Sequence, residues 1–258
     1  MTDSKNDGLT AAAIGLLAMC IVTCDHEALG HGSACLLLDG HIRLLTSSLF
    51  RCDTRSGWID PAGPAANLIM GTAALLAVRL VPQRMVALKL LLLTITAFSF
   101  FWEAAYVVDA MIVRHGDLYF FAEFLVGEPP LWLRVFASLA GLALYVATIR
   151  LTTRALLRLW PSSAGRSIAR TVWLSATAGA AVAALLYRCP GWGNERDAVL
   201  EIGAASLPLL FIPRANTSEL TSSIGLARNW SLIVLAVVVF VAFAATLGRG
   251  SPLWAFAG

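Results

Sequence analysis

Residues 9–38, LTAAAIGLLAMCIVTCDHEALGHGSACLLL, form an apolar run that is long enough to cross a lipid bilayer. The pair His26-Glu27 and a second histidine, His31, interrupt this run. Ionisable side chains are costly in hydrocarbon unless they are paired or bound to a metal, so in a membrane segment they mark a functional site. This stretch therefore predicts both a membrane protein and the position of its site.

The composition of the whole chain agrees with a membrane protein. Of its 258 residues, 58% are hydrophobic and only 14% are charged, whereas about 25% of the residues of soluble proteins are charged. The 19 basic residues lie mostly between apolar runs. This placement is typical of topology signals and contacts with lipid headgroups, and it argues against nucleic-acid binding.

Six apolar segments reach the length of about 20 residues that a transmembrane helix requires. They are residues 9–38, 59–81, 85–113, 131–160, 168–188 and 229–247. The polar stretch 39–58 contains alternating residues that favour a short hairpin, and the apolar run 198–212 is short enough to predict a re-entrant or interfacial helix. We expect an all-α polytopic membrane protein with one domain, 1–258, in which 1–125 hold the site and 126–258 add further helices.

Arginines predict the orientation of the chain. Arg150, Arg154 and Arg158 recur every four residues and therefore share one helix face, and Arg166 and Arg170 follow closely. The positive-inside rule places this connection in the cytoplasm. Six spans then put both termini in the cytoplasm and the 39–58 loop outside.

The five cysteines have no zinc-ribbon spacing. Cys20, Cys24 and Cys35 lie in the first apolar run, and we interpret them as small buried thiols. Cys52 and Cys189 fall in loops on the same predicted side, so a disulfide could join them if that side is oxidising.

The spacing of the two histidines decides what the first helix can bind. His26 and His31 are five residues apart, which is about 140° in a regular α-helix, too far round for one metal ion. A π-turn adds one residue and restores a shared face, and Gly30 is the residue best suited to permit it. Two other interpretations remain open: a metal site of Glu27 and His31 with Cys24 nearby, or a metal-free polar cluster.

A third metal ligand must come from a later segment. Asp117 is the first choice because it follows a helix end in a loop beside Gly116, and Asp109 and His115 are the second and third. As an alternative, Asp117 caps the N-terminus of the next helix.

Glu103 also lies within an apolar segment. It is either a partner that orients a metal-binding histidine or a buried acid satisfied by the Tyr106 hydroxyl.

With these residues in view, the chain resembles the site-2-protease-type intramembrane zinc metalloproteases, as a divergent bacterial relative. The resemblance rests on the HEALGH segment, residues 26–31, and on AGPAAN, residues 62–67, which looks like the G-P-x-x-N element of that family. It covers roughly residues 14–125. The histidine spacing is one residue longer than in the family, and the family's N-x-x-P…D-G segment is not recognisable.

The resemblance implies an intramembrane metalloprotease that hydrolyses peptide bonds of membrane-associated substrates in the bacterial inner membrane. His26, His31 and Asp117 would bind zinc. Glu27 would be the general base for a water activated by zinc, and Asn67 would hydrogen-bond the substrate backbone or the oxyanion. Alternatively, Asn67 only links two helices. A transmembrane protein as substrate and membrane lipids are the implied partners.

Two other functions stay open at this point. One is a noncatalytic scaffold with the same fold. The other is a proton- or ion-coupled transporter that uses Glu27, Glu103 and Asp109, although no inverted repeat is evident. Four histidines are too few for a membrane di-iron enzyme.

Overall fold

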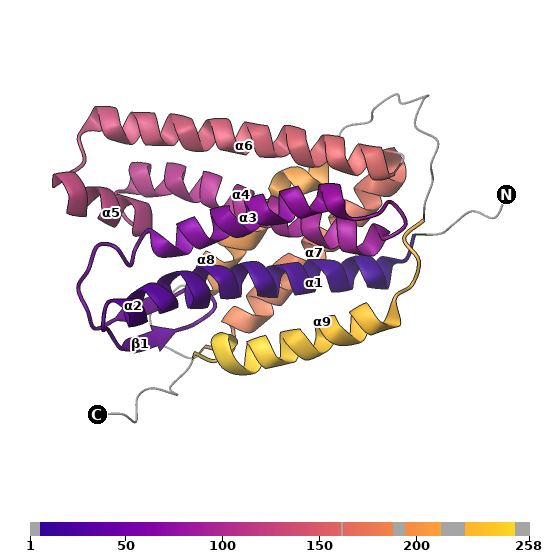
Figure 1. Ribbon diagram of the computed structural model, residues 1–258, viewed down its shortest axis with the longest axis horizontal. Coiled ribbons are helices and arrows are strands. Elements are labelled where there is room, and N and C mark those ends of the chain that lie inside the picture. The colour runs from indigo at the N-terminus through magenta and orange to yellow at the C-terminus, as the bar shows by residue number, and fades with distance from the viewer. Residues whose placement is uncertain (1–5, 161, 188–193, 213–224, 251–258) are drawn as a thin grey trace.

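Long helices make up most of the structure and run along one common axis (Figure 1). The computed structural model describes residues 6–160, 162–187, 194–212 and 225–250. Within these residues, five helical segments are long and apolar enough to cross a membrane: Gly8–Leu37, Ala62–Leu80, Val86–Val113, Leu131–Leu159 and Trp230–Gly248. The chain is thus a mostly helical membrane protein, as the sequence predicts.

The first half of the chain contains the hairpin and four of these segments. Its elements are α1 (Gly8–Cys24), the π-helix η1 (Asp25–Gly32), α2 (Ser33–Leu37), β1 (Ile42–Leu45), β2 (Phe50–Cys52), α3 (Ala62–Leu80), α4 (Val86–Val113), α5 (Asp117–Val126) and α6 (Leu131–Leu159). The second half contains α7 (Ser162–Ala184), α8 (Asn194–Ala198), the π-helix η2 (Val199–Ala204), the 3-10 helix η3 (Leu207–Phe211), α9 (Trp230–Phe243) and the π-helix η4 (Ala244–Gly248).

Helices α1 and α4 form the centre of the bundle. The largest fully buried side chains include Ile14 and Met19 on α1 and Phe98, Phe101 and Trp102 on α4. Outer helices instead expose large apolar side chains, as α6 and α9 do along much of their length. A face of this kind is suited to lipid tails and would be a liability in water. The segment that carries both histidines is therefore the middle of the fold.

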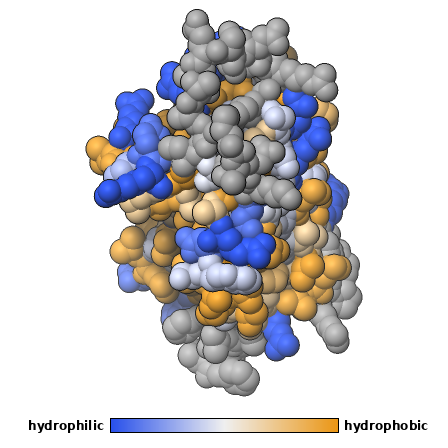
Figure 2. Space-filling view, turned by 90° about the vertical axis from the view of Figure 1, so that its right-hand side faces the viewer, coloured by the Kyte–Doolittle hydropathy of each residue, from blue (hydrophilic) through white to orange (hydrophobic). Residues whose placement is uncertain are grey.

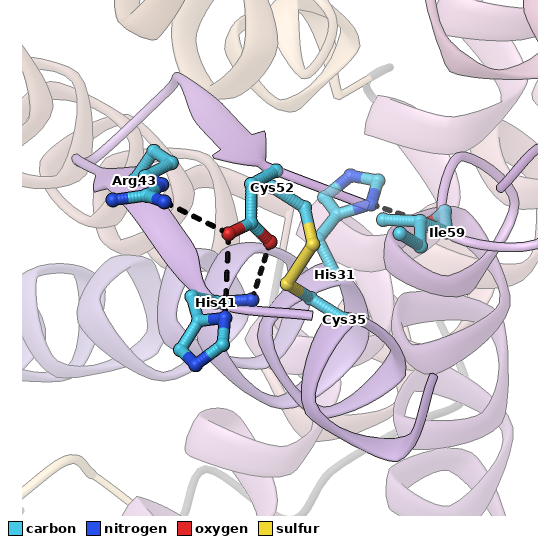
Figure 3. The surroundings of a disulfide bond; sticks show 7 residues. His31, Cys35, His41, Arg43, Cys52 and Ile59 are labelled. Atoms are coloured by element: carbon cyan, nitrogen blue, oxygen red, sulfur yellow. Dashed lines mark hydrogen bonds and ion pairs between the residues drawn. A yellow bond between two sulfur atoms is a disulfide. The ribbon is translucent and has the colours of Figure 1, made fainter. Parts of the chain in front are cut away.

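The predicted hairpin is present between the first two spans. Strand β1 pairs antiparallel with β2, with Leu45 opposite Phe50. A disulfide joins Cys35, in α2, to Cys52, in β2 (Figure 3). The prediction of a buried free thiol at Cys35 is therefore wrong, as is a bond from Cys52 to Cys189, a residue that lies outside the described ranges. The hairpin folds back over the end of its own helix, so Cys35 is the partner within reach.

Residues 168–188, the fifth predicted span, fall largely within α7, and Arg188 lies outside the described residues. Helix α7 is not among the five segments that are long and apolar enough to cross a membrane. It packs against α1 in the core, where Val172 and Ala176 are fully buried.

The run 198–212 lies antiparallel to α7 over its described length. Side-chain donors of α7 bind its backbone carbonyls in reverse order: Arg166 Nε donates to Ile212 O (3.2 Å) and Trp173 Nε1 to Gly203 O (2.9 Å). It is a succession of short helices rather than one helix. Within residues 198–212 the segment continues along α7 and does not turn back on itself, and the prediction of a re-entrant or interfacial helix is not confirmed.

Helix α9 begins beside the start of α1. The Asp7 backbone N–H donates to Leu226 O (2.8 Å), and the Asn229 backbone N–H donates to Thr10 Oγ1 (3.0 Å). At the other end, Gly250 lies against Thr46 of the hairpin. Helix α9 therefore runs from the N-terminal end of the bundle to the hairpin end, whereas the predicted six-span topology would have it run the other way, and the count of six spans is not confirmed.

Gly15 lets α1 approach α7 closely, and this contact can be tested. A Cβ atom at Gly15 would collide with the backbone of Val172, whereas a Cβ atom at Gly8 meets nothing within 4 Å. We expect Gly15→Ala to lower the free energy of unfolding by about 1–3 kcal/mol, since overpacking of a tight contact costs that much. Thermal unfolding in detergent measures the change, with Gly8→Ala as the control on the same helix. Equal stability of both variants would contradict this packing.

Candidate metal centre

The π-helix brings the two histidines of the first span onto one face. His26 Nε2 and His31 Nε2 lie 3.2 Å apart, and both side chains are buried, at 3% and 4% exposed. The wider turn extends from Asp25 to Gly32, longer than the single inserted residue that the spacing demands. A π-helix adds residues to each turn, so a five-residue separation becomes a shared face.

Asp117 completes the group from the start of α5. Its Oδ2 lies 3.2 Å from His31 Nε2 and 3.6 Å from His26 Nε2. The chain returns to the site because α4 ends at Arg114 in the left-handed conformation (φ 60°) and Gly116 follows at φ 99°. Gly116, not Asp117, is the N-cap of α5, so the alternative role of Asp117 as a cap is excluded.

The three ligand atoms have the separations that a small tetrahedral cation needs. They form a His-His-Asp group that could hold a metal ion. In a tetrahedral site with bonds of about 2.1 Å, ligand atoms lie about 3.4 Å apart. The separations of 3.2, 3.2 and 3.6 Å lie on both sides of that value.

The outer nitrogens of both rings are already engaged. His31 Nδ1 donates to the carbonyl oxygen of Ile59 (2.8 Å), and His26 Nδ1 donates to Glu103 Oε1 (3.0 Å). In a neutral imidazole, a proton on Nδ1 leaves a lone pair on Nε2. Two nitrogen lone pairs and a carboxylate then face one another, an arrangement that a bound cation stabilises and that is repulsive without one.

Aromatic rings hold both imidazoles in place. Trp102 stacks on His26, with ring centroids 4.4 Å apart and an interplanar angle of 11°, and Phe50 stacks on His31 at 5.4 Å and 20°. Phe50 belongs to β2, which the disulfide ties to α2 (Figure 3). The walls of the site therefore come from the core on one side and from the hairpin on the other.

Gly63 and Gly30 make room for the ligand atoms. A Cβ atom at Gly63 would collide with His31 Nε2 and lie 2.7 Å from His26 Nε2, and a Cβ atom at Gly30 would lie 2.5 Å from Gly63 Cα. Neither glycine has a positive φ. Gly30 is thus required for the close approach of α3, and the backbone of the π-turn does not itself demand it.

Glu27 is buried next to the group without belonging to it. Its side chain is 3% exposed, and its Oε2 has no hydrogen-bond partner within the described ranges. It interacts electrostatically with all three ligand side chains. A buried carboxylate oxygen without a partner is costly, so a ligand or a water is expected at this position. The alternative site of Glu27 and His31 with Cys24 lacks support, because the ligand group contains His26 instead.

Asn67 lies at the Nδ1 edge of the His26 ring, whereas the ligand group lies at its Nε2 edge. Its side chain is fully buried, and Nδ2 donates to Glu103 Oε1 (2.8 Å) and lies 3.1 Å from His26 Nδ1. The predicted contact of Asn67 with substrate or oxyanion does not fit this placement. Glu103 binds His26 and Asn67 rather than the Tyr106 hydroxyl. Of its two predicted roles, the structure therefore has the one in which Glu103 orients a histidine.

The other candidates for the third ligand lie elsewhere. Asp109 is exposed on α4, and the His115 ring packs against Phe120 at 5.0 Å. Sequence reasoning missed two supports of the site. The Tyr106 hydroxyl accepts a hydrogen bond from the backbone N–H of Asp117 (3.0 Å), and Trp102 stacks on His26. The three-residue spacing of Glu103 and Tyr106 on α4 suggests a contact between these two side chains instead, so no local signal in the sequence points to the bond between Tyr106 and Asp117.

The pKa values of Asp117 and Asp60 depend on the two histidines. Burial acts to raise the pKa of Asp117, but when His26 and His31 carry protons on Nε2 their hydrogen bonds to the carboxylate outweigh burial and hold that pKa well below the usual value. Burial and the Asp117 carboxylate raise the pKa of Asp60 to about 6, partly offset by His31. The imidazoles therefore favour an ionised Asp117, the form that binds a cation.

No family model, curated protein or solved structure matches the chain. The function is therefore argued from the geometry of the site.

Metal content tests the ligand group directly. We expect about one divalent ion per purified chain, and its loss in His26→Ala, His31→Ala and Asp117→Ala, because each removes one of three ligand atoms. Elemental mass spectrometry on the detergent-purified protein measures the ratio. His115→Ala, outside the group, is the control and should keep the ion. A metal-free wild type after incubation with zinc, or full content in His26→Ala, would sink the three-ligand site.

Proposed function

We propose that the protein is an intramembrane zinc metallopeptidase. The observation that carries this proposal is that two histidine nitrogens of an apolar helical segment converge with the Asp117 carboxylate, next to Glu27, whose Oε2 has no partner among the described residues. Ionisable groups within transmembrane segments are rare, and they mark functional sites.

The set of ligands supports zinc over other cations. Two imidazoles with one carboxylate at tetrahedral separations match catalytic zinc sites, which keep the fourth position open. Magnesium and calcium favour six or more oxygen ligands and would leave imidazoles unused. When bound, zinc lowers the pKa of water towards 7 and polarises a peptide carbonyl.

The remaining chemistry falls to residues of the chain. Glu27 accepts the proton of the attacking water and delivers it to the leaving amine, as a buried general base next to the metal can. Glu103 orients His26, and Asn67 in turn fixes Glu103 through its amide N–H. Asn67 is thus proposed as a positioning residue. Trp102 and Phe50 limit the access of bulk water to the imidazoles.

The competing functions receive less support. In the transporter hypothesis, Glu27, Glu103 and Asp109 would form an ion path, but Glu103 is engaged with His26 and Asn67 and Asp109 is exposed. A noncatalytic scaffold would have the same ligand group without turnover. Activity measurements separate it from the enzyme.

Replacing Glu27 tests catalysis apart from metal binding. We expect Glu27→Gln to lower the turnover of single-span peptides in bicelles by about a hundredfold or more, since loss of a general base costs that much. Metal content should stay near that of the wild type. Cleavage is followed by mass spectrometry over a panel of such peptides.

Glu128→Gln is the matched control, because Glu128 is exposed and pairs with Arg114 away from the site. A zinc-loaded wild type that cleaves no peptide would support the scaffold instead. Ion flux into vesicles that Glu103→Gln abolishes would support the transporter.

We also propose an orientation in which the hairpin faces the oxidising side of a bacterial inner membrane. Disulfides persist in oxidising compartments, and the Cys35–Cys52 bond lies at the hairpin end. The arginines at the end of α6 lie at the opposite end (Figure 1), which the positive-inside rule assigns to the cytoplasm. In this arrangement α7 and residues 194–212 cross the membrane within the shelter of the bundle.

This orientation predicts that the two ends of the chain face opposite sides. Helices α1 and α9 begin at the same end of the bundle, so an odd number of crossings follows. A reporter fused to the N-terminus should be active in the cytoplasm, and one fused to the C-terminus should be active outside it. Both reporters on one side would contradict the proposed crossing of 194–212.

A further inference from the structure

A groove with a basic rim lies at the end of the bundle opposite the metal centre. It has a volume of about 480 Å³ and lies between α3, α4 and α6. Four arginines line it: Arg79, Arg150, Arg154 and Arg158. Its floor is apolar and includes Leu75, Val78, Leu93 and Leu151. Figure 2 faces this end of the bundle and shows hydrophilic groups set among apolar ones.

Among the described residues, no carboxylate balances the charges of this groove. No acidic residue lines it, and within the described part of the chain none of its arginines forms an ion pair with a carboxylate. By contrast, Arg166 and Arg170 of the neighbouring α7 donate to the backbone carbonyls of Ile212 and Leu210. Within the described ranges, the groove arginines are therefore a separate group without carboxylate partners.

The spacing on α6 adds to this imbalance. Arg150, Arg154 and Arg158 are successive i, i+4 neighbours, and like charges at that spacing repel one another. Arg79 adds a fourth positive charge from α3. An anion seated among them would relieve this repulsion and would accept several charge-assisted hydrogen bonds.

A second groove on the other side of α6 shares two of the arginines. It has a volume of about 540 Å³, and Arg150 and Arg154 line it together with apolar side chains such as Ile149, Leu207 and Phe211. Arg150 and Arg154 thus lie between two largely apolar grooves at the surface of α6. A ligand that combines an anionic head with apolar chains matches this pattern.

We propose that the groove between α3 and α6 binds an acidic phospholipid. The phosphate lies among the arginines, where clusters of basic residues next to a membrane recognise anionic headgroups. An acyl chain lies along the apolar floor. The site is independent of the proposed peptidase activity, and its contents do not depend on the metal centre.

Lipid binding to the full-length, delipidated protein in detergent tests this site. Native mass spectrometry compares phosphatidylglycerol with phosphatidylcholine of the same acyl chains. We expect tighter binding of phosphatidylglycerol, and a roughly thirtyfold loss of that affinity in the double variant Arg79→Gln/Arg154→Gln, because each arginine contributes about fivefold. The double variant Arg55→Gln/Arg84→Gln, with the same change of charge outside the groove, should bind as the wild type does.

Three results would overturn the proposal. Equal affinity for the two lipids would show that the arginines serve topology alone. Equal losses in both double variants would show an effect of net charge rather than a site. Glycerol phosphate that binds as tightly as the whole lipid would show an anion site that makes no use of the apolar floor. Metal content, measured alongside, should stay unchanged in every variant and reports correct folding.

Discussion

The close approach of α3 to the π-helix is the constraint on which the rest of the site depends. At Gly63 and Gly30 the two backbones come so near that no side chain fits between them. This contact sets the Ile59 carbonyl against His31 and the Asn67 amide against Glu103. The loop before α3 therefore orients His31 directly, and α3 orients His26 through Asn67 and the Glu103 carboxylate of α4.

The sequence predicted the parts of this arrangement that follow from local geometry. The five-residue separation of His26 and His31 requires an expanded turn if both are to share a face, and the hairpin follows from alternation in a polar loop. Asp117 is brought in by a reversal at Gly116, and the glycine beside it was the sign of that return. These features depend on neighbours in the chain, which a sequence displays directly.

What the sequence did not reveal depends on partners far along the chain. The Cys35–Cys52 bond needs the hairpin to fold onto its own helix, and loop positions alone do not show that. The position of Asn67 near the start of a helix predicts a contact with substrate, but the sequence does not show which edge of the His26 ring this side chain contacts. The path of 194–212 is set by carbonyls that bind Arg166 and Trp173. Its hydrophobicity could not distinguish a return from a crossing.

The glycine at position 63 has a consequence for distant sequences of this kind. A Cβ atom at this position would collide with His31 Nε2 and would lie 2.7 Å from His26 Nε2, so a larger residue there would displace both imidazoles. A chain that keeps both histidines but carries a larger residue there could not hold the two Nε2 atoms and the α3 backbone at these separations. Position 63 therefore restricts the geometry of the His-His-Asp group as strongly as the histidines themselves do.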